Sequence, residues 1–166
     1  LRSFDIKAAF LQGQPQSDRI IAVDPVPELR KALNLSSSQI CKLNKGAYGL
    51  IDAPFLWYCA LVTELNALGF EASPFDPCFF VLRTPATGET PEKLEGVLGI
   101  HVDDGIGGGS PIYEEKIKLL EKKFPFGSHK VSAFTFTGIE LNQQGDHSIT
   151  LNQSAYVRKI PSIPIE

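Results

Sequence analysis

The spacing of apolar residues along the chain predicts two helices. From Asp52 to Gly69 apolar residues recur every three or four positions, with Asp52 as the expected N-cap, Pro54 in the first turn and Gly69 as the stop. A second helix is expected to begin at Ser110 and Pro111, with charged residues on the side away from the core. The residues predicted to face the core are Trp57, Leu61, Leu65 and Leu68 in the first helix, and Tyr113, Ile117, Leu120 and Phe124 in the second.

Other segments have the pattern of strands. "DPCFFVLR" and "EGVLGIHV" are continuous apolar runs joined by a polar loop rich in Pro and Gly, which predicts a hairpin in the middle of a sheet. The run "DDGIGGGS" after them is expected to break the strand. Together with the two helices, these elements predict an α+β fold with helices packed on one face of an antiparallel sheet. Shorter strand-like segments are the start of 2–10, which then turns helical, "RIIAVDP", "SQICKLNK" and the two flanks of "NQQGDH".

The composition fits one globular domain. Of 166 residues, 43% are hydrophobic and 21% are charged, and the net charge is -3, so a disordered chain is excluded. No stretch approaches the roughly 20 apolar residues of a membrane span, and no membrane partner is expected. The absence of Met and the patterned first segment indicate a piece of a longer protein. The mild acidity, considered alone, disfavours a nucleic-acid partner.

The cysteines and histidines disfavour several kinds of site. Cys41, Cys59 and Cys78 are odd in number and lie in apolar contexts, so buried reduced thiols are expected. The three histidines form no pair at metal-ligand spacing, which disfavours a zinc site. No Ser or Cys lies in a nucleophile-elbow motif, so hydrolases of that kind are disfavoured as well.

Three carboxylates stand apart from the others. Asp103 and Asp104 directly follow an apolar strand, where two adjacent negative charges repel each other, and their neighbours are glycines rather than cations. A divalent cation such as Mg²⁺ is therefore the expected compensation. Asp5 lies between Phe4 and Ile6 at another strand-like end, and three carboxylates from two strand ends suit two-metal phosphoryl transfer. On the Asp-Asp-Gly sequence alone, an ordinary hairpin turn is the preferred interpretation.

Six motifs in order resemble the reverse transcriptase domain of copia-type LTR retrotransposons. They run from Phe4 to about Val157, nearly the whole chain. Each motif is weak by itself, and their common order makes the resemblance strong. The motifs are "FDIKAAFLQG", "ICKLNKGAYGLIDAPFLWY", "GFEASPFDPCFFV", "LGIHVDDGIGGG", "FTGIEL" and "ITLNQSAYV".

The resemblance implies a fold and a metal site. Residues 1–166 would be a polymerase palm with part of the fingers and no thumb, as a fragment of a longer polyprotein. Asp5, Asp103 and Asp104 would be the catalytic carboxylates that bind two Mg²⁺ ions, with Mn²⁺ as the alternative metal. The carbonyl of Ile6 would be a further metal contact.

The resemblance also assigns roles in substrate binding. Phe10 would be the aromatic gate that excludes a ribose 2′-hydroxyl, although a core phenylalanine is a serious competing interpretation. Tyr48 and Gly49 would contact the incoming nucleotide and the template base. His101 and Gly138 would contact the primer, Gly138 as part of the primer grip.

The chain departs from the family pattern at several positions. His101 stands where the family commonly has Tyr, which could change how the primer end is held. Ile51 and Asp52 replace the usual Lys-Gln pair, and Phe55 replaces a frequent Arg, so positive charge is missing near the template path. These departures favour reduced affinity or a decaying element copy.

The leading hypothesis is an RNA-directed DNA polymerase domain that extends a primer with deoxynucleoside triphosphates. Its partners would be an RNA or DNA template with primer and the integrase and RNase H parts of the polyprotein. It would act inside the cell, in the cytoplasm or in virus-like particles, with access to the nucleus. Two alternatives stay open: a catalytically silent remnant that at most binds nucleic acid, and an α+β binding module with an acidic Ca²⁺ or Mg²⁺ turn.

Overall fold

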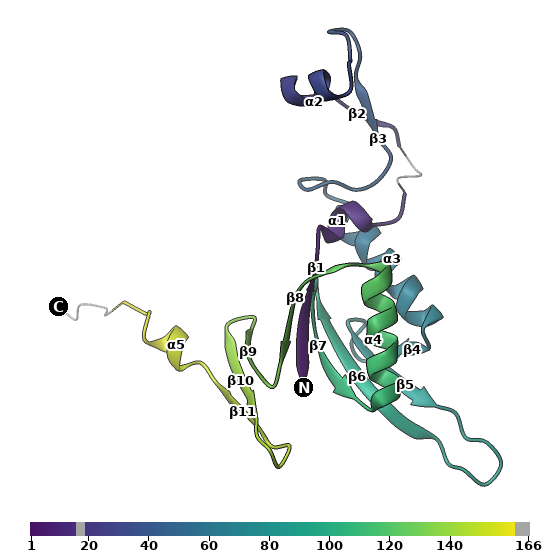
Figure 1. Ribbon diagram of the computed structural model, residues 1–166, viewed down its shortest axis with the longest axis vertical. Coiled ribbons are helices and arrows are strands. Elements are labelled where there is room, and N and C mark those ends of the chain that lie inside the picture. The colour runs from purple at the N-terminus through teal and green to yellow at the C-terminus, as the bar shows by residue number, and fades with distance from the viewer. Residues whose placement is uncertain (16–18, 162–166) are drawn as a thin grey trace. The chain divides into compact units, whose positions relative to one another are not determined.

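The computed structural model describes residues 1–15 and 19–161. The chain forms two compact units, one of Leu1–Lys7 with Gly69–Glu166 and the other of Ala8–Leu68. Figure 1 shows their elements along the colour ramp. The first unit holds the large sheet, so the N-terminal strand belongs to the same unit as the C-terminal half of the chain.

The larger unit is built on a six-stranded antiparallel sheet with the order β4-β5-β6-β7-β1-β8 (Figure 1). The predicted apolar hairpin is β5–β6 and lies inside the sheet, so this prediction is confirmed. The sheet also includes β8, a polar edge strand after residue 125 that the sequence pattern did not predict. The bounds are β1 Arg2–Ile6, β4 Phe70–Ala72, β5 Phe79–Thr84, β6 Lys93–His101, β7 Asp104–Gly109 and β8 Phe126–Val131.

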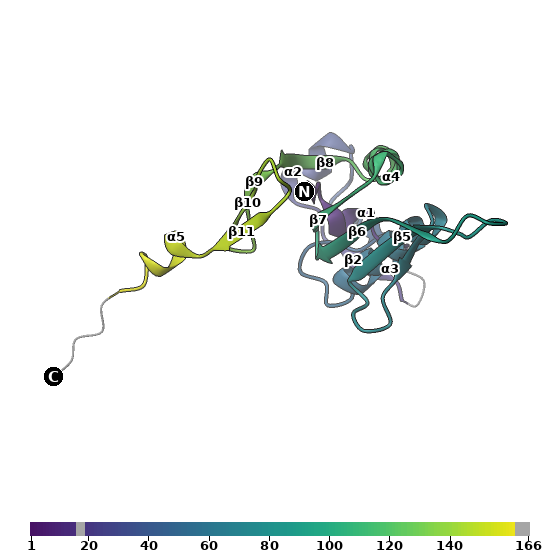
Figure 2. The same cartoon turned by 90° about the horizontal axis from the view of Figure 1, so that it is seen from below.

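Helix α4, Pro111–Lys123, packs against β6 and β7 on one face of this sheet (Figure 2). The Ser110 side chain caps its first turn by accepting a hydrogen bond from the Ile112 amide at 3.2 Å. The predicted core side of the helix is confirmed, because all four residues predicted to face the core are buried. These residues are Tyr113, Ile117, Leu120 and Phe124.

The glycine-rich run after Asp104 forms strand β7 and does not break the sheet, so that prediction was wrong. The reason is packing against aromatic rings. A Cβ at Gly105 would overlap the ring of Phe4, and a Cβ at Gly107 or Gly109 would meet Tyr113. Alternate positions of β7 therefore need glycine so that these rings can lie flat on the sheet.

A second sheet in the larger unit has three strands in the order β11-β10-β9. The predicted hairpin around "NQQGDH" is confirmed as β10–β11, but its first flank, 133–141, forms two strands, β9 and β10, instead of one. Strands β9 and β10 are joined by Thr137 and Gly138, whose φ angles of 46° and 85° are both positive, as a type I′ turn requires. The bounds are β9 Ala133–Phe136, β10 Ile139–Gln143, β11 Ile149–Asn152 and, after them, α5 Ser154–Val157.

The smaller unit is organised around the first predicted helix, which is confirmed as α3, Ala53–Ala67. Trp57, Leu61 and Leu65 are buried, and Gly69 follows the helix with a φ of 91°. Asp52 occupies the N-cap position, but its carboxylate accepts a hydrogen bond from Arg19 at 2.9 Å instead of capping the helix. The other elements are α1 Ala9–Gln12, β2 Ile21–Val23, α2 Pro27–Ala32 and β3 Cys41–Leu43.

The structure also bears on the expected state of the cysteines and on the search for membrane-spanning helices. The three cysteines are free thiols, as predicted, but each is half-buried rather than buried. Within 1–15 and 19–161, no helix combines the length and apolar character needed to cross a membrane.

Candidate active site

Asp5 and Asp104 lie on one face of the large sheet. Asp5 of β1 is directly opposite Asp104 of β7, and Asp104 is in turn opposite His101 of β6. Directly opposed residues of antiparallel strands point to the same face, so the three side chains form a row. Their β7 neighbour Gly105 belongs to the other face, the one on which Phe4 and α4 pack. The row therefore lies on the face that α4 does not cover.

Asp103 is held beside this row by a strained turn. Its carbonyl accepts a hydrogen bond from the Ile6 amide at 2.8 Å, which ties the turn to the end of β1. Val102, the residue before it, has a φ of 60°, in the left-handed region that β-branched residues rarely adopt. Such strain persists only where the surrounding structure enforces it, and it is common at functional sites.

The surroundings of Asp104 change its pKa. Burial raises the pKa of Asp104, and the nearby charges of Asp103 and Asp5 raise it further. The charges of His101 and Lys130 lower the pKa of Asp104. The three acidic residues that the sequence singled out are thus brought together, and a cation placed among them would favour their ionised forms.

The donor chemistry of this cluster fits a hard divalent cation. Carboxylate oxygens are among the ligands that Mg²⁺ and Mn²⁺ prefer, and Asp5, Asp103 and Asp104 supply them here. Among residues 1–15 and 19–161, however, no three His, Cys, Asp or Glu side chains already surround one metal position. The carboxylates lie side by side along the strand ends, and a bound ion would require them to turn toward it.

The smaller unit brings together the residues expected to bind the nucleotide. The rings of Phe10 and Tyr48 have centroids 5.1 Å apart and planes inclined by 53°. Tyr48 is 62% exposed and Phe10 is half-buried, so Phe10 is not one of the core phenylalanines. Gly49 has a φ of 93° and no atom within 4 Å of the place of a Cβ, which leaves its backbone open to approach.

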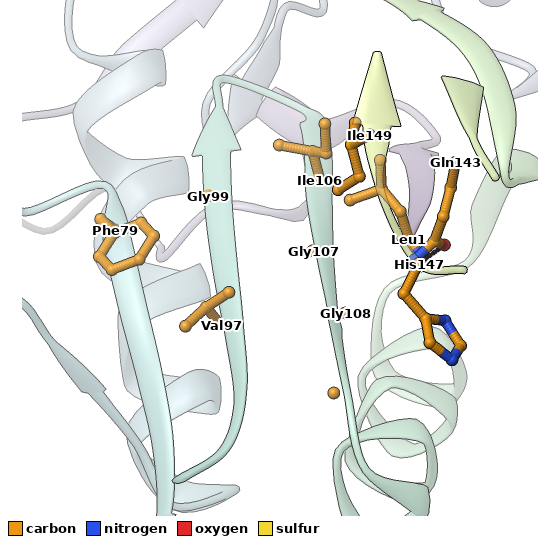
Figure 3. Close-up of a pocket in the computed structure, with 11 residues that line it drawn as sticks. Leu1, Phe79, Val97, Gly99, Ile106, Gly107, Gly108, Gln143, His147 and Ile149 are labelled. Carbon is orange, nitrogen blue, oxygen red and sulfur yellow. Dashed lines mark hydrogen bonds between the residues drawn. The ribbon is translucent and has the colours of Figure 1, made fainter. Parts of the chain in front are cut away.

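A cavity lies on the face of the large sheet that carries Val97 and Ile106 (Figure 3). This is also the face of Asp104, because Ile106 is two residues further along β7. The cavity has a volume of about 680 Å³. Phe79, Val97 and Ile106 line it from the sheet, and His147 and Ile149 from the end of the β10–β11 hairpin. No local sequence pattern indicates this cavity, because its apolar lining comes from alternate positions of strands far apart in the chain. Gly138, the predicted primer contact, lies in the β9–β10 turn and is exposed.

Two residues near the carboxylates were also missed. Lys130 of β8 lies opposite Ser3 of β1, and its charge acts on Asp104. Gly127, also in β8, lies against the Asp5 carboxylate. Neither belongs to a motif, and both depend on the pairing of β8 with β1, which the polar sequence of β8 does not indicate.

Comparison with known proteins gives one consistent result. A model of the reverse transcriptase (RNA-dependent DNA polymerase) family matches residues 1–162. The retrovirus-related Pol polyprotein from transposon RE2 of Arabidopsis thaliana is 30% identical over 160 residues, which cover 94% of this chain and 10% of that polyprotein. The corresponding polyprotein from transposon RE1 of the same plant is 28% identical over 159 residues, covering 95% of the chain and 10% of the polyprotein.

A more distant relative agrees with these. The retrovirus-related Pol polyprotein from transposon TNT 1-94 of Nicotiana tabacum is 27% identical over 104 residues, or 63% of the chain and 7% of that polyprotein. The chain thus spans about a tenth of the length of the Arabidopsis relatives it matches. No solved structure matches the chain.

Proposed function

Because the chain belongs to the reverse transcriptase (RNA-dependent DNA polymerase) family, we propose that it extends a primer with deoxynucleotides as part of a copia-type Pol polyprotein. The observation that carries this proposal is the register pairing of Asp5 with Asp104, beside Asp103. A turn-only metal site would involve the Asp103–Asp104 pair and would leave Asp5 without a role. The larger unit then acts as the polymerase palm, and the smaller unit as part of the fingers.

Asp5, Asp103 and Asp104 would hold the metal ions, with the Ile6 carbonyl as a further ligand. When bound, two Mg²⁺ ions supply activation of the primer hydroxyl and stabilisation of the leaving pyrophosphate. In the reaction, the primer 3′-oxygen bonds to the α-phosphorus while the bond from that phosphorus to the α–β bridging oxygen breaks. Pyrophosphate leaves, and the hydroxyl proton passes to water. The raised pKa of Asp104 supports this assignment, because a nearby cation would lower that pKa and favour the ionised carboxylate.

The remaining residues of the proposal bind and select the substrates. Phe10, supported by the ring of Tyr48, would exclude a ribose 2′-hydroxyl. Gly49 offers an open backbone to the nucleotide or the template base. His101 and Gly138 would hold the primer end, His101 as a flat polar platform beside Asp104.

The proposal extends to partners and place of action. The template is RNA or DNA paired with a primer, and the integrase and RNase H parts of a Pol polyprotein would act with this chain. The reaction would take place in the cytoplasm or in virus-like particles, with nuclear access for the product. Because the palm carboxylates are offset by metal ions, the net charge of -3 does not oppose nucleic-acid binding.

The exposure of two apolar side chains favours a second candidate function. Ile51 is 96% exposed and Phe55 is 66% exposed, at positions where the family resemblance leads one to expect cations. Loss of phosphate contacts there would weaken template binding and make it less salt-dependent. The second candidate is therefore a silent remnant that binds nucleic acid without extending a primer.

Primer extension by a Pol polyprotein that carries this chain distinguishes the two functions. The wild type should extend a primed RNA template with Mg²⁺, and the pair Asp103→Asn and Asp104→Asn should abolish extension while template binding persists. Extension that is unaffected by the pair would contradict the polymerase site. A wild type that binds primed template but never extends it would support the remnant.

A further inference from the structure

We propose that Gly127 is a positioning residue for Asp5, because the bulge at Gly127 leaves the space that the Asp5 carboxylate occupies. This inference rests on the proposed role of Asp5 as a metal-binding carboxylate. It assigns a function to a residue outside the six sequence motifs. The evidence is the register of β1 with β8 and the space around Gly127.

The register between β1 and β8 shifts at Asp5. Asp5 is opposite Ser128, and Ile6 is opposite Phe126, so Gly127 is an extra residue without a partner in β1. An extra residue of this kind bends its strand and changes the direction of nearby side chains. The bulge thus lies directly beside the proposed metal-binding carboxylate.

The space around Gly127 is filled by the Asp5 side chain. A Cβ at Gly127 would approach Oδ1 of Asp5 to under 3.0 Å and would lie 3.7 Å from Cγ of Asp5 and 3.2 Å from Cγ of Lys7. The nearest atoms thus all belong to side chains and none to the backbone. The φ of Gly127 lies outside the left-handed region, so alanine is allowed there by the backbone.

An alanine at this position should therefore move the carboxylate and leave the fold intact. Rotation about the side-chain bonds of Asp5 relieves the contact, whereas the strand itself need not shift. This distinguishes Gly127 from Gly107, where a Cβ would meet the carbonyl oxygen of Val97 in the neighbouring strand. It also differs from Gly145, which has nothing within 4 Å of a Cβ and serves as the matched control.

Mn²⁺ binding by the 166-residue chain, followed by electron paramagnetic resonance, tests the inference without relying on activity. Gly127→Ala should weaken Mn²⁺ binding about tenfold, the effect expected when a ligand loses its orienting contact. Gly145→Ala should bind as the wild type does. In the Asp5→Asn background, Gly127→Ala should add nothing, because its effect passes through that carboxylate.

The outcomes separate this inference from the proposed function. If Asp5→Asn weakens Mn²⁺ binding but Gly127→Ala does not, the positioning role is overturned and the metal site stands. If Asp5→Asn has no effect, the metal site and the positioning role both fall. A Gly127→Ala chain that loses its cooperative unfolding transition also overturns the inference, since only the carboxylate is expected to move.

Discussion

Asp5 of β1 and Asp104 of β7 are direct cross-strand neighbours. The distance between them is thus set by the antiparallel register, and the same register brings Asp103 to the end of β1 through the Ile6 amide. A site built on paired strands is more rigid than one built on loops. The packing of Phe4 and Tyr113 against the glycines of β7 helps to hold β7 beside β1, and it therefore contributes to the position of the carboxylates.

Glycine at position 107 should be necessary for the stability of the larger unit. A Cβ there would meet the Tyr113 hydroxyl and the carbonyl oxygen of Val97, and the backbone cannot move away cheaply. Gly107→Ala should lower the free energy of unfolding by about 2–3 kcal/mol, as overpacking commonly does. Urea denaturation measures this, with Gly145→Ala as the neutral control. Equal stability of the two variants would contradict the close packing of β7.

The hydroxyl of Tyr113 should lower the free energy of unfolding. Tyr113 is fully buried, and its Oη has no hydrogen-bond partner within the described part of the chain. Burial accordingly raises the pKa of Tyr113. Tyr113→Phe keeps the ring on Gly96 and removes the unpaired group, so the free energy of unfolding should rise by about 1 kcal/mol. A fall of similar size in thermal or urea unfolding would show that the hydroxyl is paired after all.

Glu95 should make stability depend on acid pH. The Ser110 side chain, with Lys93 and Thr84, holds the pKa of Glu95 below its usual value. Thr84 Oγ1 donates to Glu95 Oε1 at 3.0 Å. Because the pKa is lower in the folded state, this stabilisation is present above the unfolded pKa, about 4.3, and is lost as the pH falls through the folded value.

Glu95→Gln tests that pH dependence. Urea unfolding at a series of pH values should show a smaller loss of stability below about pH 4.3 in the variant than in the wild type. The exposed Glu115→Gln on α4 is the control and should keep the wild-type slope. If Glu95→Gln and the wild type lose stability in parallel, the three hydrogen-bond donors do not stabilise the carboxylate.

Phe10 should control the choice of sugar. Phe10→Val removes the ring that faces Tyr48 and should raise ribonucleotide incorporation relative to deoxynucleotide incorporation by about tenfold or more. Tyr48→Phe keeps the ring pair and should leave this ratio unchanged. Single-nucleotide incorporation by a Pol polyprotein carrying each variant gives the ratio. An unchanged ratio in Phe10→Val would assign Phe10 a packing role.

Periodicity predicted the helices well because their burial is local. Tyr113, Ile117 and Leu120 recur at helical spacing, and Ser110 provides a cap next to them in the sequence. The glycine strand β7 was not predictable in the same way. Glycine is a poor strand residue by itself, and the reason for Gly105 lies in the ring of Phe4, which is distant in the sequence.

The candidate site likewise has some features that the local sequence predicts and others that depend on distant segments. The types of residue at Asp5, Asp103 and Asp104, with the family resemblance, singled out carboxylates that the structure places close together, and their role in metal binding stays a prediction. Their register, the bulge at Gly127 and the approach of Lys130 depend on strand pairing between distant segments, which no local pattern specifies.

Mg²⁺-dependent primer extension by a Pol polyprotein carrying Asp5→Asn tests the central claim most directly, because only a site built from both strands needs Asp5. The rate should fall by about 10³-fold or more, since metal-ion stabilisation of the transition state contributes several kcal/mol. Glu115→Gln should extend the primer at the wild-type rate. Wild-type extension by Asp5→Asn would contradict a catalytic site formed by Asp5 and Asp104.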